Sequence, residues 1–375
     1  MNPMHVGLLI YGSLATISGG FLYDRQLVKE LENAGHTVDI VSVPWRSYPR
    51  HLTDNWSKTL LDQLCHAPFD LLLQDELNHP SLVWLNRRLR KQVSYPLISI
   101  VHHLRSSETH PSLQMPFYRW IERQYLTSID GFLFNSQTTR ATVMELAPNT
   151  KPQIVAYPAA DHRQPPAAAV IYATRHARAA SQAPLRILFV GNVIARKGLH
   201  HLVQALALVD REQWHLRVLG SLTSEPRYVE EIRQLLGALH LAANVKLEGA
   251  ASDEAIFAAY QTSDLFAAPA YEGFGIVYLE AMSFGLPVIA ATDGAAYEIV
   301  TDSENGYLVA PDDHAALAEH IERLVREPAL LEKLSIGARR RYEIHPTWHA
   351  TFVPVIDWLS KQIENVSYPK RTEGR

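Results

Sequence analysis

Two glutamates, Glu272 and Glu280, are separated by seven residues, and a turn made of Gly273, Phe274 and Gly275 directly follows the first. An apolar run that ends in proline precedes the turn and predicts a strand, and the residues after the turn predict a helix. A turn that opens a helix presents unpaired backbone N–H groups and the positive end of the helix dipole, which suits a phosphate. The carboxylates would repel a phosphate and suit neutral hydroxyls, such as those of a sugar and a ribose. The stretch therefore predicts a ligand site, and the alternative is a capped helix with a surface glutamate at each end.

A second candidate segment, residues 191–198, is a glycine-bounded turn that follows the apolar run 186–190 and carries Asn192, Arg196 and Lys197. Open parallel sheets bind ligands at the carboxyl ends of their strands, so this turn and the Glu272 turn belong on the same edge. Arginine and lysine hold a diphosphate through charge-assisted hydrogen bonds, each worth about 1.5–3 kcal/mol. The alternative is a solvated basic turn.

The order of elements predicts the fold that positions these turns. Strands and helices alternate twice along the chain, which favours two parallel sheets, each covered on both faces. The expected fold is α/β, with two doubly wound, Rossmann-like domains and a cleft between them. The expected boundaries are an N-terminal domain over 1–160, a linker over 161–184, a C-terminal domain over 185–345, and a final helix with a tail over 346–375. The first strand is followed by Gly19 and Gly20 but by no G-x-G-x-x-G fingerprint, so these glycines let the loop approach a ligand.

Composition narrows the class of protein. The chain has 375 residues and a formal net charge of −4, so no global basic surface indicates nucleic acid. The single cysteine, Cys65, excludes an intramolecular disulfide, argues against a cysteine-based metal site and fits a reducing compartment. The N-terminus lacks the pattern of a signal peptide, and no apolar run is long enough to span a membrane. We therefore expect a cytoplasmic protein.

The C-terminal half resembles the retaining, nucleotide-sugar-dependent glycosyltransferases of the two-Rossmann-domain (GT-B) type, specifically their large family 4. The glutamate pair, the Arg196–Lys197–Gly198 turn, the glycine turn near Gly294, the order of elements and the tract 280–290 carry this resemblance. It is strong over 186–345 and weaker over 1–160. Trp348 is similar to the aromatic residue before the last helix in the family, which crosses back onto the first domain.

The resemblance implies a role for each residue of the motif. Glu272 would contact hydroxyls of the donor sugar, and Glu280 would bind the ribose hydroxyls. The diphosphate would be neutralised by Arg196 and Lys197 without a metal. The remaining expected donor-side positions are the backbone N–H groups of Gly273, Phe274 and Gly275, and the first-domain residues Gly19, Gly20, Ser136 and His102, with His103 as the alternative to His102. Asn192 departs from the family, where arginine is common at this position, so Arg196 supplies that charge or the diphosphate is held by one cation fewer.

The implied activity is transfer of a hexose-type sugar from a UDP-, GDP- or ADP-sugar to an acceptor hydroxyl, with retention of configuration and with no cofactor. The acceptor would be a glycan, a glycolipid or a small molecule. The alternatives are a nucleotide-sugar epimerase or phosphorylase-like enzyme of the same fold, a non-catalytic two-domain ligand-binding protein, and an inactive relative that serves as a scaffold.

Two basic and aromatic stretches, 84–93 and 117–121, fit peripheral contact with an anionic membrane through the N-terminal domain. The alternative is that they belong to amphipathic helices packed on the sheet.

Overall fold

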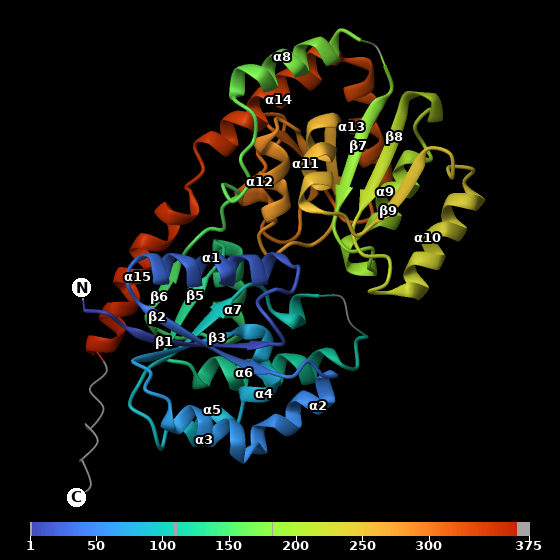
Figure 1. The fold of residues 1–375 in the computed structure, drawn as a ribbon. Coiled ribbons are helices and arrows are strands. Elements are labelled where there is room, and N and C mark those ends of the chain that lie inside the picture. The colour runs from blue at the N-terminus through green and yellow to red at the C-terminus, as the bar shows by residue number, and fades with distance from the viewer. Residues whose placement is uncertain (1, 109–110, 182, 366–375) are drawn as a thin grey trace, which may run out of the picture. The chain divides into compact units, whose positions relative to one another are not determined.

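The computed structural model describes residues 2–108, 111–181 and 183–365, and it divides the chain into two compact units. Unit 1 contains residues 1–158 together with 346–375, and unit 2 contains residues 159–345. Each unit is built on one six-stranded parallel sheet with helices around it (Figure 1). These are the two Rossmann-like α/β domains that the sequence predicts.

The sheet of unit 1 has the strand order β2-β1-β3-β4-β5-β6. Its strands are β1 (His5–Tyr11), β2 (Thr37–Val43), β3 (Leu71–Asp75), β4 (Leu97–Val101), β5 (Gly131–Phe134) and β6 (Gln153–Val155). The strands β3, β4 and β5 are buried along their whole length, as expected for parallel strands covered on both faces. The chain leaves β1 toward β2 on one side and β3 pairs on the other, so the order reverses between β1 and β3. Such a reversal is where open α/β sheets bind ligands.

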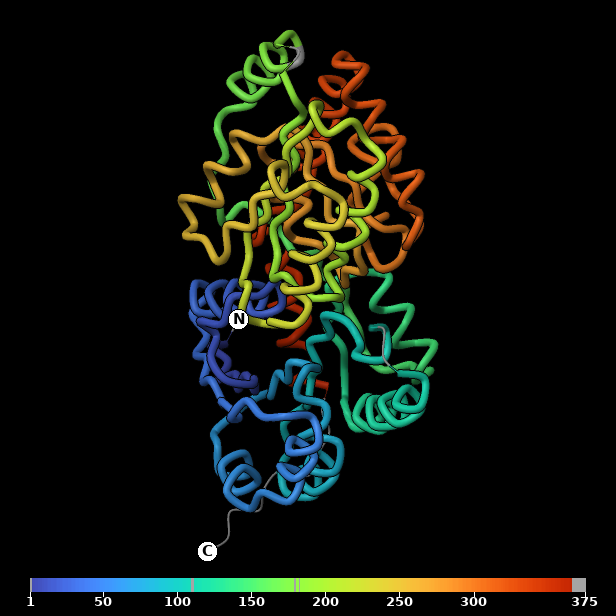
Figure 2. Tube along the Cα trace, turned by 90° about the vertical axis from the view of Figure 1, so that its right-hand side faces the viewer, coloured from blue at the N-terminus to red at the C-terminus, as the bar shows by residue number. Residues whose placement is uncertain are grey.

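Helices from both ends of the chain cover the sheet of unit 1. They are α1 (Gly19–Asn33), α2 (Tyr48–Thr53), α3 (Lys58–His66), α4 (His79–Leu82), α5 (Leu85–Leu89), α6 (Met115–Ser128), α7 (Gln137–Leu146) and α15 (Trp348–Asn365). The C-terminal helix α15 packs against α1, and Figure 2 shows this red segment among the blue and green parts of the trace. The rings of Trp348 and Phe352 lie 5.8 Å and 5.1 Å from the ring of Tyr23. Unit 1 is therefore completed by the last helix of the chain.

The sheet of unit 2 has the strand order β12-β11-β10-β7-β8-β9. Its strands are β7 (Leu185–Val190), β8 (Trp214–Leu219), β9 (Val245–Gly249), β10 (Leu265–Ala268), β11 (Val288–Ala291) and β12 (Gly306–Val309). The order reverses between β7 and β10, which lie side by side in the sheet. The turns that follow these two strands carry the cationic and acidic residues singled out from the sequence.

The helices of unit 2 pack against one another as well as on the sheet. They are α8 (Ala168–Ala179), α9 (Leu199–Leu206), α10 (Pro226–Ala238), α11 (Asp253–Thr262), α12 (Ile276–Ser283), α13 (His314–Arg326) and α14 (Pro328–Glu343). The helix α9 packs against α10 and α13, whereas α14 packs against α8 and α12. The segment expected as a linker thus lies inside unit 2 and contributes the helix α8.

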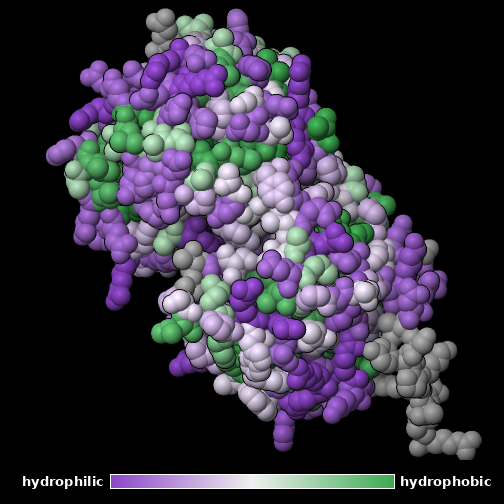
Figure 3. Space-filling model, turned by 180° about the vertical axis from the view of Figure 1, so that it is seen from behind, coloured by the Kyte–Doolittle hydropathy of each residue, from purple (hydrophilic) through white to green (hydrophobic). Residues whose placement is uncertain are grey.

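The surface on the side opposite to Figure 1 is mostly hydrophilic, and its apolar side chains occur in small groups (Figure 3). Among the described residues, none of the helices combines the length and the apolar content that crossing a bilayer requires.

Candidate functional site

The candidate site in unit 2 begins at the turn after β7. Residues Ala195–Lys197 form a short 3-10 helix, and Gly198 caps the start of α9 with a left-handed backbone (φ +65°). A β-carbon at Gly198 would lie 2.9 Å from the carbonyl oxygen of Pro269, which follows β10. The glycine therefore lets the β7 turn and the β10 turn pack directly against each other.

This close packing brings Lys197 and Glu272 into contact. The Nζ of Lys197 forms an ion pair with the Oε1 of Glu272, and the two side chains are 16% and 14% exposed. Arg196 lies beside them and donates from Nη1 to the carbonyl oxygen of Tyr271 at 3.5 Å. The residues expected at one edge of the sheet are thus neighbours at that edge, and both charged groups of the ion pair remain partly open to solvent.

The glycine turn after Glu272 has a conformation that few other residues could adopt. Gly275 has a φ of +98°, and a β-carbon there would lie 2.3 Å from the ring of Tyr278. The hydroxyl of Tyr278 donates to the carbonyl oxygen of Ala268 at 3.0 Å, which holds the start of α12 against the end of β10. Phe274 is buried, and its ring lies 6.0 Å from that of His345. The turn is therefore rigid, and the N-terminus of α12 directly follows it.

A third turn, which follows β11, fixes the backbone of Glu272. Gly294 forms a β-bridge with Glu272, and the N–H of Ala295 donates to the carbonyl oxygen of Glu272 at 2.9 Å. A β-carbon at Gly294 would lie 2.4 Å from that oxygen, so the approach requires glycine at this position. The carboxylate of Glu272 is consequently positioned by its main chain on one side and by Lys197 on the other.

Asn192 lies at the beginning of the cationic turn and is exposed. Its Oδ1 accepts a hydrogen bond from the N–H of Ser221 at 3.3 Å. This contact ties the β7 turn to the turn after β8, where Gly220 lies so close to Gly191 that a β-carbon would be 1.9 Å from its carbonyl oxygen.

Glu280 lies in α12 and is almost fully buried. Its Oε1 accepts from the Nε2 of His162 at 2.9 Å and from the Nε of Arg163 at 3.3 Å, and its Oε2 accepts from the hydroxyl of Tyr260 at 2.9 Å. Burial acts to raise the pKa of Glu280, but the hydrogen bonds and charges of these partners outweigh it and hold the pKa below its ordinary value. Glu280 is therefore an ionised carboxylate held by three donors.

No sequence pattern predicted that His162 and Arg163 contact Glu280. They belong to the proline-rich segment read as a linker, and they lie more than a hundred residues from Glu280 along the chain. Arg163 also pairs with Asp253 at 2.8 Å, so it joins the start of unit 2 to α11 as well as to α12.

Two of the first-unit residues expected near the ligand, Gly19 and Gly20, follow β1 at the reversal point of the sheet. Gly19 and Gly20 are the first residues of α1, whose N-cap is Ser18. A β-carbon at Gly20 would lie 3.1 Å from the ring of His102, so α1 and the end of β4 approach closely. The Nε2 of His102 is 3.1 Å from the Oδ1 of the fully buried Asp24. Sequence reasoning did not single out Asp24, which no recognisable motif marks.

The charge state of His102 follows from its surroundings. Burial acts to lower its pKa, but Asp24 and then Asp75 raise it above the ordinary value. Burial and the charge of Asp24 in turn raise the pKa of Asp75 to about 7. His102 therefore carries a proton more readily than an ordinary histidine. The buried acids Asp24 and Asp75 stabilise its positive charge.

The neighbours of His102 have structural partners. The Nε2 of His103 is 3.0 Å from the Oε1 of Glu108. Ser136 is the N-cap of α7, and its hydroxyl accepts from the N–H of Thr139 at 3.0 Å. The structure thus places His102, and not His103, against Gly20 and α1.

Sequence comparison places these observations in a family. The profile of the family described as "Glycosyl transferases group 1" matches residues 173–341. A D-inositol 3-phosphate glycosyltransferase from Corynebacterium urealyticum is 33% identical over 373 residues, which cover 87% of this chain and 87% of that protein. The capsular polysaccharide biosynthesis glycosyltransferase CapM from Staphylococcus aureus is 30% identical over 190 residues, which cover 50% of this chain and 47% of CapM. The chain thus spans about half the length of CapM and most of the length of the Corynebacterium urealyticum protein.

Solved structures agree at the level of the fold. Sucrose-phosphate synthase from Thermosynechococcus elongatus superposes with a TM-score of 0.79 at 22% identity, covering 96% of this chain and 99% of that one. HepE from Anabaena in complex with UDP gives a TM-score of 0.74 at 20% identity, covering 96% and 100%. The fold is therefore the GT-B fold, with two Rossmann-like α/β domains.

The chain belongs to the group 1 family of glycosyl transferases.

Proposed function

We propose that this protein transfers a hexose-type sugar from a nucleoside-diphosphate sugar to an acceptor hydroxyl, with retention of configuration. The observation that carries the proposal is the contact between Lys197 and Glu272 at the point where the strand order of the second sheet reverses. A cation and a carboxylate at this reversal point match the two parts of the donor, which are an anionic diphosphate and a sugar that carries hydroxyl groups. Relatives named as glycosyltransferases and mannosyltransferases support the same class of reaction.

In this proposal the ion pair between Lys197 and Glu272 breaks when the donor binds, and each side chain contacts the donor instead. Lys197 and Arg196 turn to the diphosphate, and Glu272 accepts hydrogen bonds from the sugar hydroxyls. The N-terminus of α12 adds backbone N–H groups and the positive end of the helix dipole. Glu280 receives the ribose hydroxyls, which would replace or share the hydrogen bonds from His162 and Tyr260.

The chemical step then follows from charge. The bond between the anomeric carbon and the diphosphate oxygen breaks, and the acceptor oxygen forms its bond to that carbon on the same face. The acceptor proton passes to the leaving diphosphate oxygen. Lys197 and Arg196 stabilise the charge that develops on the diphosphate, which is the electrostatic contribution that most lowers such barriers. A covalent intermediate on a carboxylate is the rival route to the same stereochemistry.

The identity of the donor is tested first, by measuring which nucleotide sugars bind. A panel of UDP-, GDP- and ADP-sugars is added to the protein, and the melting temperature is measured, because a ligand that binds the folded state raises it. HepE was crystallised with UDP and with UDP-glucose, so the UDP-sugars are the first to be examined. We expect one nucleotide class to stabilise the protein.

Turnover is tested by acceptor-dependent release of the nucleoside diphosphate. Removal of Lys197 by Lys197→Ala is expected to lower kcat/KM by about 10²–10³-fold, the usual effect of losing one group that stabilises developing negative charge. The matched control is Lys246→Ala, because Lys246 pairs with Glu248 at 3.6 Å but is 75% exposed at the far end of a strand. Unchanged turnover in Lys197→Ala would contradict the proposed role, and an inverted product anomer by NMR would contradict retention.

The role of His102 is tested separately. We propose that it contacts the donor sugar, so His102→Ala is expected to lower kcat more than it raises KM. Gly20→Ser, which would press on the same ring, is expected to have a similar but smaller effect. A His102→Ala protein with normal turnover would remove this residue from the proposal.

We further propose that an aromatic face of unit 1 makes peripheral contact with an anionic membrane. The ring of Trp84 lies 5.4 Å from that of Trp56 and 6.2 Å from that of Trp120, and the outer two rings are 64% and 48% exposed. Arg119 and Arg123 are exposed on the same helix as Trp120. Exposed tryptophans with neighbouring arginines suit the interface between headgroups and acyl chains.

The stretch 84–93 contributes fewer free cations to this aromatic face than its sequence indicates. Arg88 donates to the carbonyl oxygen of Asn55 at 2.8 Å, and Arg90 donates to that of Ser128 at 3.1 Å. The membrane proposal is tested by co-sedimentation with phosphatidylserine vesicles and with neutral vesicles. Arg119→Gln with Arg123→Gln is expected to remove the salt-dependent part of binding, whereas Arg233→Gln on α10 is not. Equal sedimentation of all three proteins would contradict the contact.

A further inference from the structure

Among the described residues, three groups of side chains place potential metal ligands within 4.8 Å of one another. Two of the groups lie in unit 1 and are dominated by buried carboxylates, and one of them contains His102. The third group consists of His201, Asp312 and His314 in unit 2. It differs from the others because two of its three members are imidazoles and because it is open to solvent, with Asp312 75% exposed.

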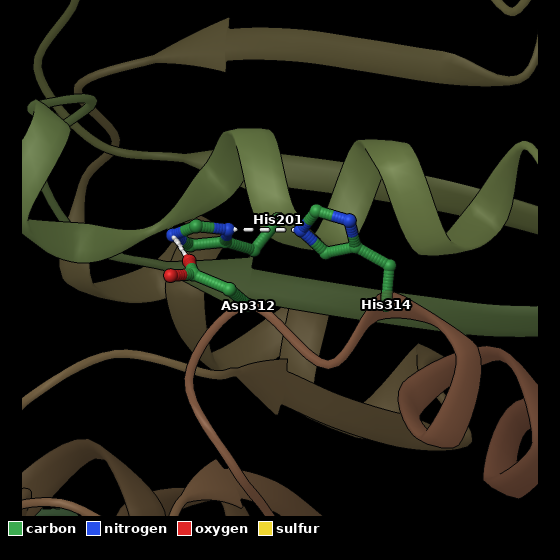
Figure 4. Close-up of side chains that lie close together, drawn as sticks. All are labelled: His201, Asp312 and His314. Atoms are coloured by element: carbon green, nitrogen blue, oxygen red, sulfur yellow. Dashed lines mark hydrogen bonds and ion pairs between the residues drawn. The ribbon is translucent and has the colours of Figure 1, made fainter.

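The three side chains of the third group contact one another directly. His201 projects from α9, Asp312 lies in the turn between β12 and α13, and His314 is the first residue of α13 (Figure 4). The Nδ1 of His201 is 3.0 Å from the Nε2 of His314, and the Nε2 of His201 is 3.1 Å from the Oδ1 of Asp312. Figure 4 shows the ring of His201 between the other two side chains.

The elements that carry these side chains are held firmly. The helices α9 and α13 pack against each other in the core of unit 2. Asp313 caps α13 by accepting from the N–H of Ala316 at 2.9 Å, and the N–H of His314 donates to the carbonyl oxygen of Asp312 at 2.9 Å. Ligands carried by packed helices and a capped turn are positioned before an ion arrives, which favours binding.

The hydrogen bonds of the group show how an ion would be accommodated. A neutral imidazole has one N–H donor and one acceptor nitrogen. If His201 donates to Asp312 through Nε2, its Nδ1 accepts from the Nε2–H of His314. A cation between the two imidazole nitrogens would displace that proton, which moves to Nδ1 of His314, while Asp312 keeps the Nε2–H of His201 and so orients the ring.

We propose that His201, Asp312 and His314 form a binding site for a divalent transition-metal ion of the zinc class. Two imidazole nitrogens are typical zinc ligands, and water molecules would complete a tetrahedron. Asp312 accepts from the other nitrogen of His201, as carboxylates do behind zinc-bound histidines. Nitrogen ligands select zinc, cobalt or nickel over magnesium and calcium, which prefer all-oxygen sites.

The site would connect the start of α9, directly after the cationic turn, to the turn between β12 and α13. A β-carbon at Gly198, next to Lys197, would lie 3.3 Å from the His201 ring. Asp293 precedes the glycine that bridges to Glu272, and burial and the charge of Asp312 raise its pKa. A bound ion would therefore hold the start of α9 and the turn before α13 together beside the Lys197–Glu272 pair. Binding itself does not depend on the proposed function.

The experiment uses the full chain, freed of metal with a chelator that is then removed. Zinc binding is measured by calorimetry, and cobalt binding by its visible absorption, which reports coordination geometry. We expect one equivalent of either ion to bind, with an absorption band typical of a four- or five-coordinate cobalt site, and magnesium to give no signal.

Three variants decide whether these residues form the site. Asp312→Asn, His314→Asn and His201→Asn are each expected to weaken zinc binding at least about tenfold. Asp312 is exposed, so Asp312→Asn keeps the proposal testable if a histidine variant fails to fold. The matched control is His176→Gln, because His176 pairs with Glu332 at 2.9 Å on the surface of the same unit. Its affinity is expected to equal that of the unaltered protein.

Either of two results would overturn the proposal. The first is the absence of stoichiometric zinc and cobalt binding to the unaltered protein. The second is binding that survives both Asp312→Asn and His314→Asn, or that falls equally in His176→Gln. The readout is ion binding and not turnover, so neither result bears on the proposed transfer reaction.

Discussion

At the scale of single residues, the most demanding position is Gly275. Its φ of +98° and its 2.3 Å approach to the Tyr278 ring exclude a β-carbon. Gly275→Ala is therefore expected to lower the free energy of unfolding by about 1–3 kcal/mol from backbone strain alone, with more from the clash. It should also weaken donor binding, because the turn that opens α12 would shift.

The control for this prediction is another glycine of unit 2. Gly237 lies in α10 with nothing within 4 Å of its β-carbon position. Gly237→Ala is expected to stabilise the protein by about 0.5–1 kcal/mol through helix propensity. Thermal melts of the two variants should shift in opposite directions, and a shift in the same direction would contradict the conformational argument.

A second residue-scale prediction concerns Glu76, which is buried beside His79. Burial, opposed in part by His103, raises the pKa of Glu76 to about 8 from 4.5. Between those values the folded state keeps a proton that the unfolded state releases, so raising the pH destabilises the protein by about 1.4 kcal/mol per unit. Glu76→Gln lacks this proton, so its stability relative to the unaltered protein should increase from pH 5 to pH 8.

Tryptophan fluorescence during urea unfolding suits this measurement. The chain has seven tryptophans, and all but Trp214 belong to unit 1. Burial lowers the pKa of His79 to about 4, which makes acid destabilising below the ordinary value of 6.5. That effect has the opposite sign to the one expected from Glu76, so the two can be told apart. Stability profiles that stay parallel across this pH range would show that Glu76 is ionised in the folded state.

At the scale of elements, α8 is tied to the sheet of unit 2 by buried charge. Arg178 of α8 and Arg186 of β7 both bond the carboxylate of Asp264, with Arg186 Nη2 to Oδ1 at 2.7 Å. Arg175 of α8 lies 3.7 Å from the same carboxylate and is buried. Burial acts to raise the pKa of Asp264, but Arg186 and Arg178 outweigh it and lower the pKa.

Asp264→Asn is accordingly expected to cost about 3–5 kcal/mol, because it leaves arginines in a buried place without their counter-charge. The measurement is the free energy of unfolding of unit 2 by circular dichroism. Glu322→Gln serves as the control, since Glu322 pairs with Arg326 on the exposed face of α13, where such pairs contribute at most about 0.5 kcal/mol. A loss in Asp264→Asn no larger than in the control would mean that α8 is held by apolar packing alone.

Elements also show what the sequence could and could not predict. The buried parallel strands were predictable because they are short continuous apolar runs, such as 186–190, which lies within β7. The helix α14 was not predicted, because a charged residue, Arg339, lies on its buried side and obscures the periodicity. The short helices α2 and α4 begin at or near prolines and carry too few residues for a periodic pattern.

The candidate site also has a part that could be predicted from the sequence and a part that could not. Contact between Lys197 and Glu272 was predictable because both follow strands of one sheet, and strand ends converge at a reversal of order. The cover of Glu280 by His162 depends on how an irregular segment folds back onto α12, and no local pattern encodes that. The roles of these residues in donor binding remain predictions.

At the scale of the whole molecule, the two units differ in how the chain builds them. Unit 2 is one continuous segment, whereas unit 1 needs α15 from the far end of the chain. Five large apolar side chains of α15 are buried: Trp348, Phe352, Val355, Ile356 and Leu359. Each contributes about 1.5–3 kcal/mol, so their sum is comparable to the whole stability of a typical domain.

A chain that ends at residue 345 is therefore expected to retain a folded unit 2 and to lose the cooperative unfolding of unit 1. The fragment 159–345 alone should melt cooperatively and should be stabilised by the nucleotide that stabilises the full chain. Circular dichroism melts and the donor panel measure both. A shortened chain with two intact transitions would contradict this account of α15.

The discontinuity of unit 1 also has a consequence for biosynthesis. A ribosome delivers residues in order, and domains commonly fold in that order as they emerge. The sheet of unit 1 is synthesised first, but the face of α1 that packs on α15 stays uncovered until α15 leaves the exit tunnel. Unit 2 is complete before that point, because it is one continuous segment. Unit 2 is thus expected to fold before unit 1, and the nascent chain is expected to need a chaperone most in the interval before α15 has been synthesised.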